Sequence, residues 1–128
     1  MRKNGGKIYF DPRLTVTYRP RKSLAALAKQ YFEYGRWRRV VSRTHKGTIN
    51  LRYLAPPFTL VGVSISIVCG LLNPLLFIPA GTYGVFLLLA SLKIGKTLRE
   101  RLFLPAILFT MHMSWGAGFI TSTRRFVR

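Results

Sequence analysis

Uncharged and charged stretches alternate along the second half of the chain. No charged residue occurs in the forty positions from Tyr53 through Leu92, and a second uncharged stretch runs from Leu102 to Thr123. A helix needs about 20 apolar residues to cross the hydrocarbon core of a bilayer. The first stretch is therefore long enough for two membrane-spanning helices, and the second is long enough for a third.

The dipeptide Asn73-Pro74 lies near the middle of the first stretch. Because proline cannot continue a helix from the preceding turn, we expect the chain to fold back at this point. The pattern thus predicts a mostly α membrane protein with two to three transmembrane helices, at about residues 53–72, 75–92 and 102–121.

A different pattern occupies residues 1–22. Lys7–Phe10 and Leu14–Tyr18 have the composition of short strands, and the turn-forming residues Asp11-Pro12-Arg13 separate them. Two short strands are marginally stable by themselves. We therefore expect a short β-hairpin that forms the edge of a larger sheet.

An amphipathic helix is predicted after Ser23, which is a favourable N-cap. Apolar and small residues recur on one face of this helix: Leu24, Leu27, Ala28, Tyr31, Tyr34 and Gly35. The stripe ends at the basic and aromatic segment Arg36–Arg39. Such a segment just before a span is typical of a helix in the membrane interface, so residues 23–52 predict an interfacial helix and a basic linker.

The segment Arg36–Arg39 admits two interpretations. As a membrane anchor, its arginines bind lipid phosphate while Trp37 lies at the headgroup level. As a binding site, it holds a phosphorylated, lipid-linked or sugar ligand, because arginine forks suit phosphates and a tryptophan face suits a sugar ring. The residues by themselves favour the anchor.

The formal net charge of +18 comes from basic residues whose positions predict how the membrane helices are oriented in the bilayer. Fourteen of the twenty-one basic residues precede residue 53, and four more lie between the two uncharged stretches, in the segment Lys93–Arg101. Basic residues that flank membrane helices remain in the cytoplasm, where they also meet anionic lipid. We therefore expect a cytoplasmic N-terminus, an external bend at Leu72–Leu75 and an internal Lys93–Arg101 loop.

The basic tail, residues 124–128, does not fit this scheme, because three spans would leave Arg124, Arg125 and Arg128 outside. One option is that the positive-inside tendency is overridden here. The other is that Leu102–Thr123 is re-entrant or interfacial and returns the tail to the cytoplasm. The sequence leaves both options open and favours three spans.

Few residues in the chain are suited to catalysis. The membrane explains the basic excess and no nucleic-acid-binding motif is present, so nucleic acid is not an expected partner. Cys69 is the only cysteine, which excludes an intramolecular disulfide. The three acids, Asp11, Glu33 and Glu100, are far apart in the sequence. We therefore predict no catalytic residue and no metal site in this chain.

Within the predicted spans, His112 is the only plainly ionisable side chain. A neutral histidine bonded to a neighbouring helix is its expected state. Gly62, Ser66 and Gly70 recur every four residues. This spacing of small residues favours close helix packing, within the chain or in self-association.

Three segments together resemble the C-terminal portion of bacterial family-2 glycosyltransferases, in the group related to succinoglycan and other exopolysaccharide synthases. Asn4–Arg21 resembles the end of the catalytic domain, Ser23–Arg38 resembles the helix that follows, and Met111–Phe119 resembles the last membrane helix. The resemblance extends over nearly the whole chain.

The resemblance implies a function. Such enzymes carry an α/β donor-binding domain with an Asp-x-Asp metal motif and a catalytic Asp, and none of these occurs here. The chain would then be the C-terminal membrane module of an enzyme that transfers a sugar from a nucleotide-sugar donor to a lipid-linked or polysaccharide acceptor. It would be inactive alone, with residues 1–22 as the edge of a truncated catalytic domain. No cofactor is expected in this chain, and a divalent metal is expected in the missing domain.

Processive enzymes of this superfamily hold the donor diphosphate and the acceptor sugar with a Gln-x-x-Arg-Trp motif on an interfacial helix. Here five residues separate Gln30 from Arg36-Trp37, so the spacing differs from the motif. The resemblance implies that Arg36 takes the role of the motif's arginine, toward phosphate, and that Trp37 takes the role of its tryptophan, toward the acceptor sugar. Gln30, Arg36 and Trp37 are therefore the predicted substrate-binding residues.

The competing hypothesis is a small non-enzymatic membrane protein, an anchor or assembly subunit of a polysaccharide-synthesis complex. Both hypotheses place a multi-pass protein in the bacterial plasma (inner) membrane, with lipid as a partner. Nucleotide sugar and glycan acceptor are expected partners only of the full-length enzyme.

Overall fold

The computed structural model describes residues 11, 13–15, 17, 23–45, 47–48 and 50–123. These residues are almost entirely helical. The elements are α1 (Leu24–Thr44), α2 (Leu51–Gly70), the 3₁₀ helix η2 (Pro74–Phe77), α3 (Ile78–Ile94) and α4 (Leu98–Thr121).

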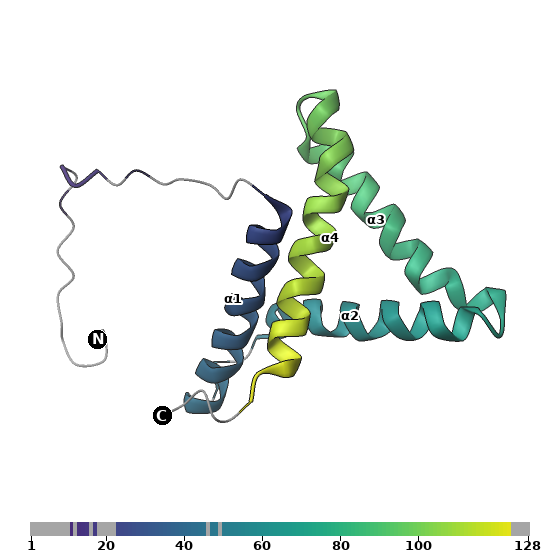
Figure 1. Ribbon diagram of the computed structural model, residues 1–128, viewed down its shortest axis with the longest axis horizontal. Coiled ribbons are helices and arrows are strands. Elements are labelled where there is room, and N and C mark those ends of the chain that lie inside the picture. Colours follow the sequence, from purple (N-terminus) through teal and green to yellow (C-terminus); the bar gives the residue numbers. More distant parts are fainter. Residues whose placement is uncertain are drawn as a thin grey trace.

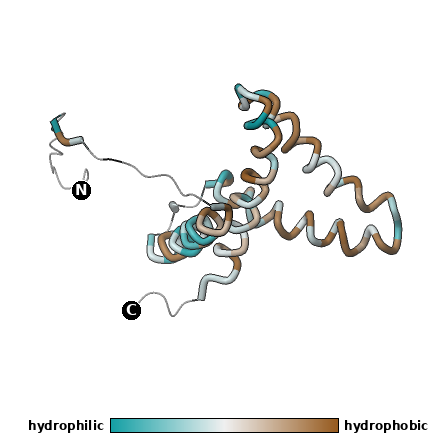
Figure 2. The backbone as a smooth tube through the Cα atoms, turned by 45° about the horizontal axis from the view of Figure 1, so that its top comes forward, coloured by the Kyte–Doolittle hydropathy of each residue, from teal (hydrophilic) through white to brown (hydrophobic). Residues whose placement is uncertain are grey.

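Three helical segments are long and apolar enough to cross a membrane: α2, the segment Pro74–Ile94, which consists of η2 and α3, and α4. Most of their large apolar side chains are exposed, and the buried hydrophobic residues of the described chain are Val40, Leu87 and Phe119. Long apolar helices with so little protein interior are expected where lipid supplies the surrounding medium. The prediction of a mostly α chain with three helices able to cross a membrane is thus confirmed, and Figure 2 shows the apolar residues along α2 and α3.

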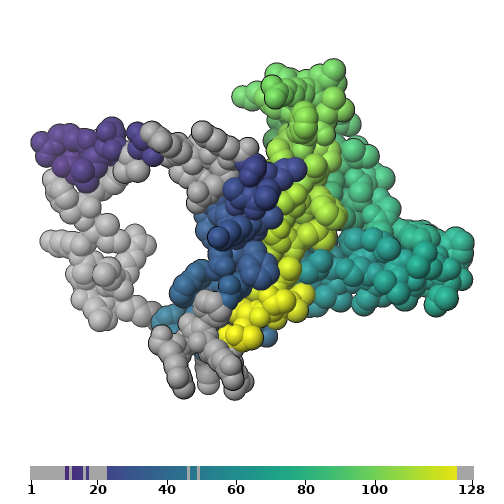
Figure 3. Space-filling view, viewed as in Figure 1, coloured from purple at the N-terminus to yellow at the C-terminus, as the bar shows by residue number. Residues whose placement is uncertain are grey.

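α2, α3 and α4 form the sides of a triangle, and α1 lies alongside α4 (Figure 1). α2 runs across α4 near the C-terminal end of α4, and α3 returns to the N-terminal end of α4. In the space-filling view, α1 lies on one side of α4 while α2 and α3 extend away on the other (Figure 3). The apolar helices therefore spread apart instead of packing into a parallel bundle.

The chain folds back at Asn73-Pro74, as the sequence predicts. The Asn73 side chain accepts a hydrogen bond from the backbone N–H of Leu75 at 3.0 Å, and Pro74 begins η2. Asparagine is a favourable N-cap, and proline is well tolerated in the first turn of a helix.

Two of the three small residues on α2 pack against the returning chain. The hydroxyl of buried Ser66 donates to the carbonyl of Leu76 at 2.6 Å and accepts from the N–H of Ala80 at 3.1 Å. Gly70 is also buried, and a Cβ there would meet the ring of Phe77. Nothing comes within 4 Å of such an atom at Gly62. Within the chain, the predicted packing face is therefore occupied at Ser66 and Gly70 and open at Gly62.

α1 begins as predicted, with the Ser23 hydroxyl accepting from the N–H of Ala26 at 3.2 Å. Its packed face, however, agrees with the predicted stripe only in part. Gly35 and Val40 are buried, whereas Leu24 and Tyr34 are exposed. Gly35 is the stripe residue at which the neighbouring helix approaches most closely, because it has no side chain to hold that helix away.

The predicted β-hairpin is not supported. Lys7–Phe10 lies outside the described residues, as does the basic tail, and the part of the chain that the structure describes contains no strand. The predicted turn has local contacts, because the Leu14 N–H donates to the Asp11 carbonyl at 3.2 Å. The Arg13 guanidinium lies 3.0 Å from the Asp11 carboxylate and lowers the pKa of that carboxyl.

Candidate functional site

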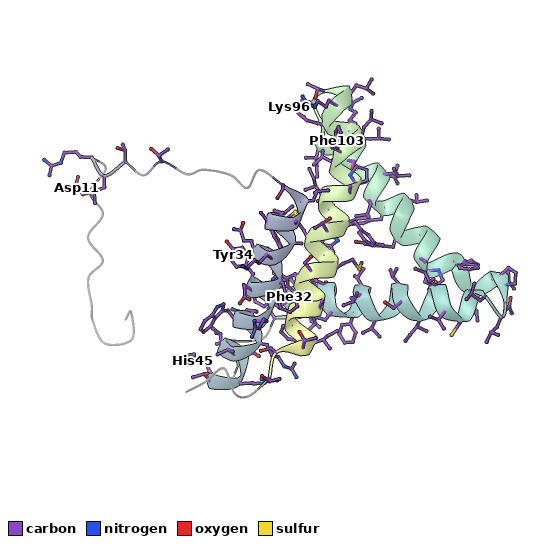
Figure 4. All side chains as sticks on the ribbon, in the orientation of Figure 1. Asp11, Phe32, Tyr34, His45, Lys96 and Phe103 are labelled. Atoms are coloured by element: carbon purple, nitrogen blue, oxygen red, sulfur yellow. The ribbon has the colours of Figure 1, made fainter. Side chains whose placement is uncertain are left out.

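The candidate site is on α1, and two glycines fix the position of this helix against α4. A Cβ atom added to Gly35 would collide with the carbonyl oxygen of Trp115, and one added to Gly118 would collide with the carbonyl oxygen of Phe32. Each glycine therefore lets one backbone touch the other. Phe32 points toward α4, whereas Tyr34 lies on the opposite side of α1 (Figure 4).

The end of α4 is tied to the basic half of α1. Arg43 Nη2 donates to the carbonyl oxygen of Ser122 at 2.9 Å, and the Ser122 hydroxyl donates to the carbonyl oxygen of Arg36 at 3.2 Å. The guanidinium of Arg39 lies 4.9 Å from the centre of the Phe119 ring. These contacts join residues about eighty positions apart and set the rotation of α1 about its axis.

Arg38 connects α1 to the start of α2. Its guanidinium carbon lies 3.5 Å from the centre of the Tyr53 ring, and its Nη2 donates to the carbonyl oxygen of Thr48. The Nε atoms of Arg38 and Arg39 are buried without a hydrogen-bond partner. Both guanidinium groups thus lie over aromatic rings within the chain, which is a cation–π use of arginine. The Arg36 guanidinium also lies near a ring, 5.7 Å from the centre of Phe32, and Trp37 is the exposed member of the segment Arg36–Arg39.

The outward face of α1 carries the predicted site residues. Gln30 and Trp37 are seven residues apart, which brings them to the same side of a helix. Gln30 Nε2 donates to the hydroxyl of Tyr34, and the indole of Trp37 is 54% exposed. Glu33 Oε1 lies 3.0 Å from Arg36 Nη1 and orients that guanidinium along the helix.

A shallow depression of about 430 Å³ lies on this face, lined by Ala26, Lys29, Gln30, Glu33 and Tyr34. Its polar groups are an amide, a phenol, a carboxylate and an ammonium group. Together with the exposed indole of Trp37, they form a set able to bind sugar hydroxyls and a sugar ring. We call Lys29, Gln30, Glu33, Tyr34, Arg36 and Trp37 the α1 outer face.

Sequence reasoning did not identify Lys29, Glu33 and Tyr34 as members of this face. The signal for Glu33 and Tyr34 is their spacing of three and four residues from Gln30, and Lys29 is four residues before Glu33, since positions three and four residues apart are neighbours on a helix. The prediction instead used the residue types of the Gln-x-x-Arg-Trp motif and assigned Tyr34 to the packed stripe.

A second hollow, of about 490 Å³, lies between α1, α2 and α4. It is lined mainly by apolar side chains, with Lys29 as its charged member: Ala28, Lys29, Phe32, Leu60, Met113, Ser114 and Ala117. The hollow lies beside the contact between α1 and α4 and shares Lys29 with the α1 outer face.

The histidine of α4 is bonded to a neighbouring helix, as the sequence predicts. His112 Nδ1 lies 3.0 Å from the Tyr83 hydroxyl of α3, and the Tyr83 ring is 6.4 Å from that of Phe109. Among the described residues, no group of three His, Cys, Asp or Glu side chains is placed to hold a metal ion. The described chain therefore offers polar binding groups and no metal-binding cluster.

Comparison with known proteins agrees with the resemblance drawn from the sequence. No family model matches the chain, and no solved structure matches it at a significant level. The chain is 27% identical over 124 residues to the succinoglycan biosynthesis protein ExoA of Rhizobium meliloti (strain 1021). The match covers 91% of this chain and 36% of that protein, so the chain spans about a third of the length of its relative. The chain is thus a distant homologue of a succinoglycan biosynthesis protein, which confirms the predicted resemblance.

Proposed function

We propose that this chain forms the C-terminal membrane module of a glycosyltransferase of exopolysaccharide synthesis. In the complete enzyme, a sugar passes from a nucleotide-sugar donor to a lipid-linked or polysaccharide acceptor. The observation that carries the proposal is the similarity to a succinoglycan biosynthesis protein over 91% of this chain. The donor-binding domain and its divalent metal belong to a different part of the enzyme, so this module alone is inactive.

The role we assign to this module is to hold substrate at the membrane surface. Trp37 offers its exposed indole to the acceptor sugar, and Gln30 offers its amide to sugar hydroxyls. Arg36, oriented by Glu33, binds phosphate of the donor or of a lipid-linked acceptor. Arg38 and Arg39 contribute indirectly, because their contacts with Tyr53 and Phe119 hold α1 in place.

A chimera tests this proposal. The region of the Rhizobium meliloti protein that aligns with this chain is replaced by the chain itself, and succinoglycan production is measured in cells that lack the native protein. We expect the chimera to restore production. In the same background, Trp37→Phe reduces the ring area over the sugar and Arg36→Lys removes the planar two-donor fork. Losing a charge-assisted contact costs about 1.5–3 kcal/mol, roughly a ten- to hundredfold loss of transfer rate.

Two matched variants serve as controls. Phe58→Leu alters an exposed aromatic residue of α2, and Arg52→Lys alters an exposed arginine at the start of α2. If the loss of transfer in Trp37→Phe and Arg36→Lys is caused by lost contacts of the α1 outer face, both control variants should transfer sugar at the parental rate. Membrane insertion and protein level are measured for every variant.

The outcomes separate the two hypotheses. Full activity of both Trp37→Phe and Arg36→Lys would reduce these residues to membrane anchors while leaving the module assignment intact. A chimera that inserts at the parental level and makes no succinoglycan would overturn the assignment and favour a non-enzymatic anchor or assembly subunit.

A further inference from the structure

The three apolar helices close into a circuit, and each corner is fixed by a contact. Ser66 of α2 bonds the start of the returning chain at Leu76 and Ala80. Arg101 of α4 donates from Nε to the Gly95 carbonyl at 3.0 Å, which closes the corner between α3 and α4. A Cβ added to Gly116 of α4 would meet the carbonyl oxygen of Pro56, so the third corner joins α4 to the beginning of α2.

This circuit limits the number of membrane crossings. Each full crossing moves the chain to the opposite face of a bilayer whose hydrocarbon core is about 30 Å thick. Three successive crossings would separate the end of α4 from the segment that precedes α2 by that thickness. Ser122, just after α4, instead bonds Arg36 and Arg43 of α1. Because Ser122 contacts α1, the chain must cross the bilayer an even number of times between them. Two of the three apolar helices therefore cross, and the third does not.

Charge shows which helix does not cross. The corner shared by α1, α2 and α4 contains Arg36, Arg38, Arg39, Arg43 and Arg52. The corner between α3 and α4 contains Lys93, Lys96, Arg99, Glu100 and Arg101, whereas the corner between α2 and α3 carries no charge. The two charged corners therefore lie at one aqueous face of the bilayer, and the uncharged corner between α2 and α3 lies at the opposite face. α4 is the helix that joins the two charged corners.

The lengths and polarity of the helices agree with this division. α2 has 20 residues and the segment Pro74–Ile94 has 21, each enough for one crossing with a moderate tilt. α4 is also long enough to cross, but its mean hydropathy of 1.4 is the lowest of the three, against 1.6 and 2.0, and it carries Thr110, His112 and Ser114 along its length. The basic helix α1 packs on its C-terminal half, so this half has a charged neighbour.

We propose that α1 and α4 form a two-helix layer in the plane of an anionic lipid surface, while α2 and α3 cross the bilayer as a hairpin. The partner of this layer is the phosphate-bearing headgroup region, which attracts the arginine and lysine side chains at both ends of α4. The arrangement returns the end of α4 to the face on which α1 lies. It also accounts for the basic tail at residues 124–128, which a third crossing would leave on the opposite face.

Accessibility labelling tests the number of crossings. Cys69 is replaced by serine, and single cysteines are introduced by Leu72→Cys, Lys96→Cys and Thr123→Cys at exposed positions. Intact cells and permeabilised cells that express the full chain are treated with a membrane-impermeant maleimide. We expect Lys96→Cys and Thr123→Cys to share one accessibility and Leu72→Cys to show the other. Opposite accessibility at Lys96→Cys and Thr123→Cys would overturn the proposal, and equal accessibility at all three positions would overturn it as well.

The depth of the helices provides a second readout. Trp37 and Trp115 are changed to phenylalanine, and one tryptophan is introduced by Phe109→Trp in α4 or, as the matched control, by Phe86→Trp in α3. Both positions are exposed and lie well within their helices. In vesicles of phosphatidylcholine with phosphatidylglycerol, lipids brominated near the chain ends should quench Phe86→Trp more strongly. Lipids brominated near the headgroup should quench Phe109→Trp more strongly. Equal and deep quenching of both would show that α4 crosses.

Discussion

α1 packs against α4 through direct backbone contact at two glycines, whereas α2 and α3 touch mainly where the chain turns between them. Away from this turn, the large apolar residues of α2 and α3 are mostly exposed. The first pair is thus stabilised by protein–protein packing, and the second pair depends on lipid to cover its surface. The comparison teaches that the candidate site is on the rigid side of the molecule, because the α1 outer face belongs to the helix with the closest packing.

The largest effect is expected from Gly118→Ala. The added methyl group meets the Phe32 carbonyl, so α1 and α4 must separate, and overpacking of this kind costs about 1–3 kcal/mol. The control is Gly62→Ala, which enters open space on α2 and should be neutral or stabilising by up to about 1 kcal/mol. Unfolding in mixed micelles, followed by tryptophan fluorescence, measures both. Equal stability of the two variants would remove the distinction between the helix pairs.

The glycine contacts also show what the sequence could not reveal. The uncharged stretches and Asn73-Pro74 predict three apolar helices and the turn, because both signals are local. Nothing local pairs Gly118 with Phe32, which lies more than eighty residues earlier. The predicted stripe on α1 included Gly35, which is buried, and also Leu24 and Tyr34, which are exposed.

The candidate site was predictable in part. Arg36 and Trp37 stand out by residue type, and the structure places Trp37 on an exposed face with Gln30. The Arg38 guanidinium lies over the Tyr53 ring because of the way in which the chain turns between α1 and α2, and composition does not specify this turn. The hairpin at residues 1–22 was inferred from strand propensity, and strands need partners that the described residues do not supply.

The second largest effect is expected from Ser66→Ala in the lipid-dependent pair. This change removes both hydrogen bonds that hold α2 to the returning chain and leaves the Ala80 N–H without this acceptor. We expect a loss of about 1–2 kcal/mol in the same assay. The matched control is Ser64→Ala, at an exposed position of the same helix. If the two serine variants are equally stable, the turn does not depend on this contact.

A smaller effect is expected from Ser122→Ala, at the end of the tightly packed pair. The hydroxyl bond to the Arg36 carbonyl is lost, but the Ser122 carbonyl still accepts from Arg43. The expected cost is about 0.5–1.5 kcal/mol. Thr123→Ala, at the exposed neighbouring position, is the control and should change stability little. A loss larger than that of Gly118→Ala would mean that hydrogen bonding, and not glycine packing, dominates the α1–α4 contact.

The smallest effect is expected from Tyr83→Phe, which tests a side-chain hydrogen bond between the two pairs of helices. The Tyr83 hydroxyl lies 3.0 Å from His112 Nδ1, and the ring remains in place when the hydroxyl is removed. Hydrogen bonds between membrane helices contribute about 0.6 kcal/mol on average, so the loss should be of that order. The control is Thr82→Val, because the Thr82 hydroxyl bonds the Ile78 carbonyl within its own helix. A double-mutant cycle with His112→Phe isolates the pairwise energy, which should be about 0.5 kcal/mol or more. Additive losses in the cycle would show that α3 and α4 are coupled by packing at Phe109 and not by this hydrogen bond.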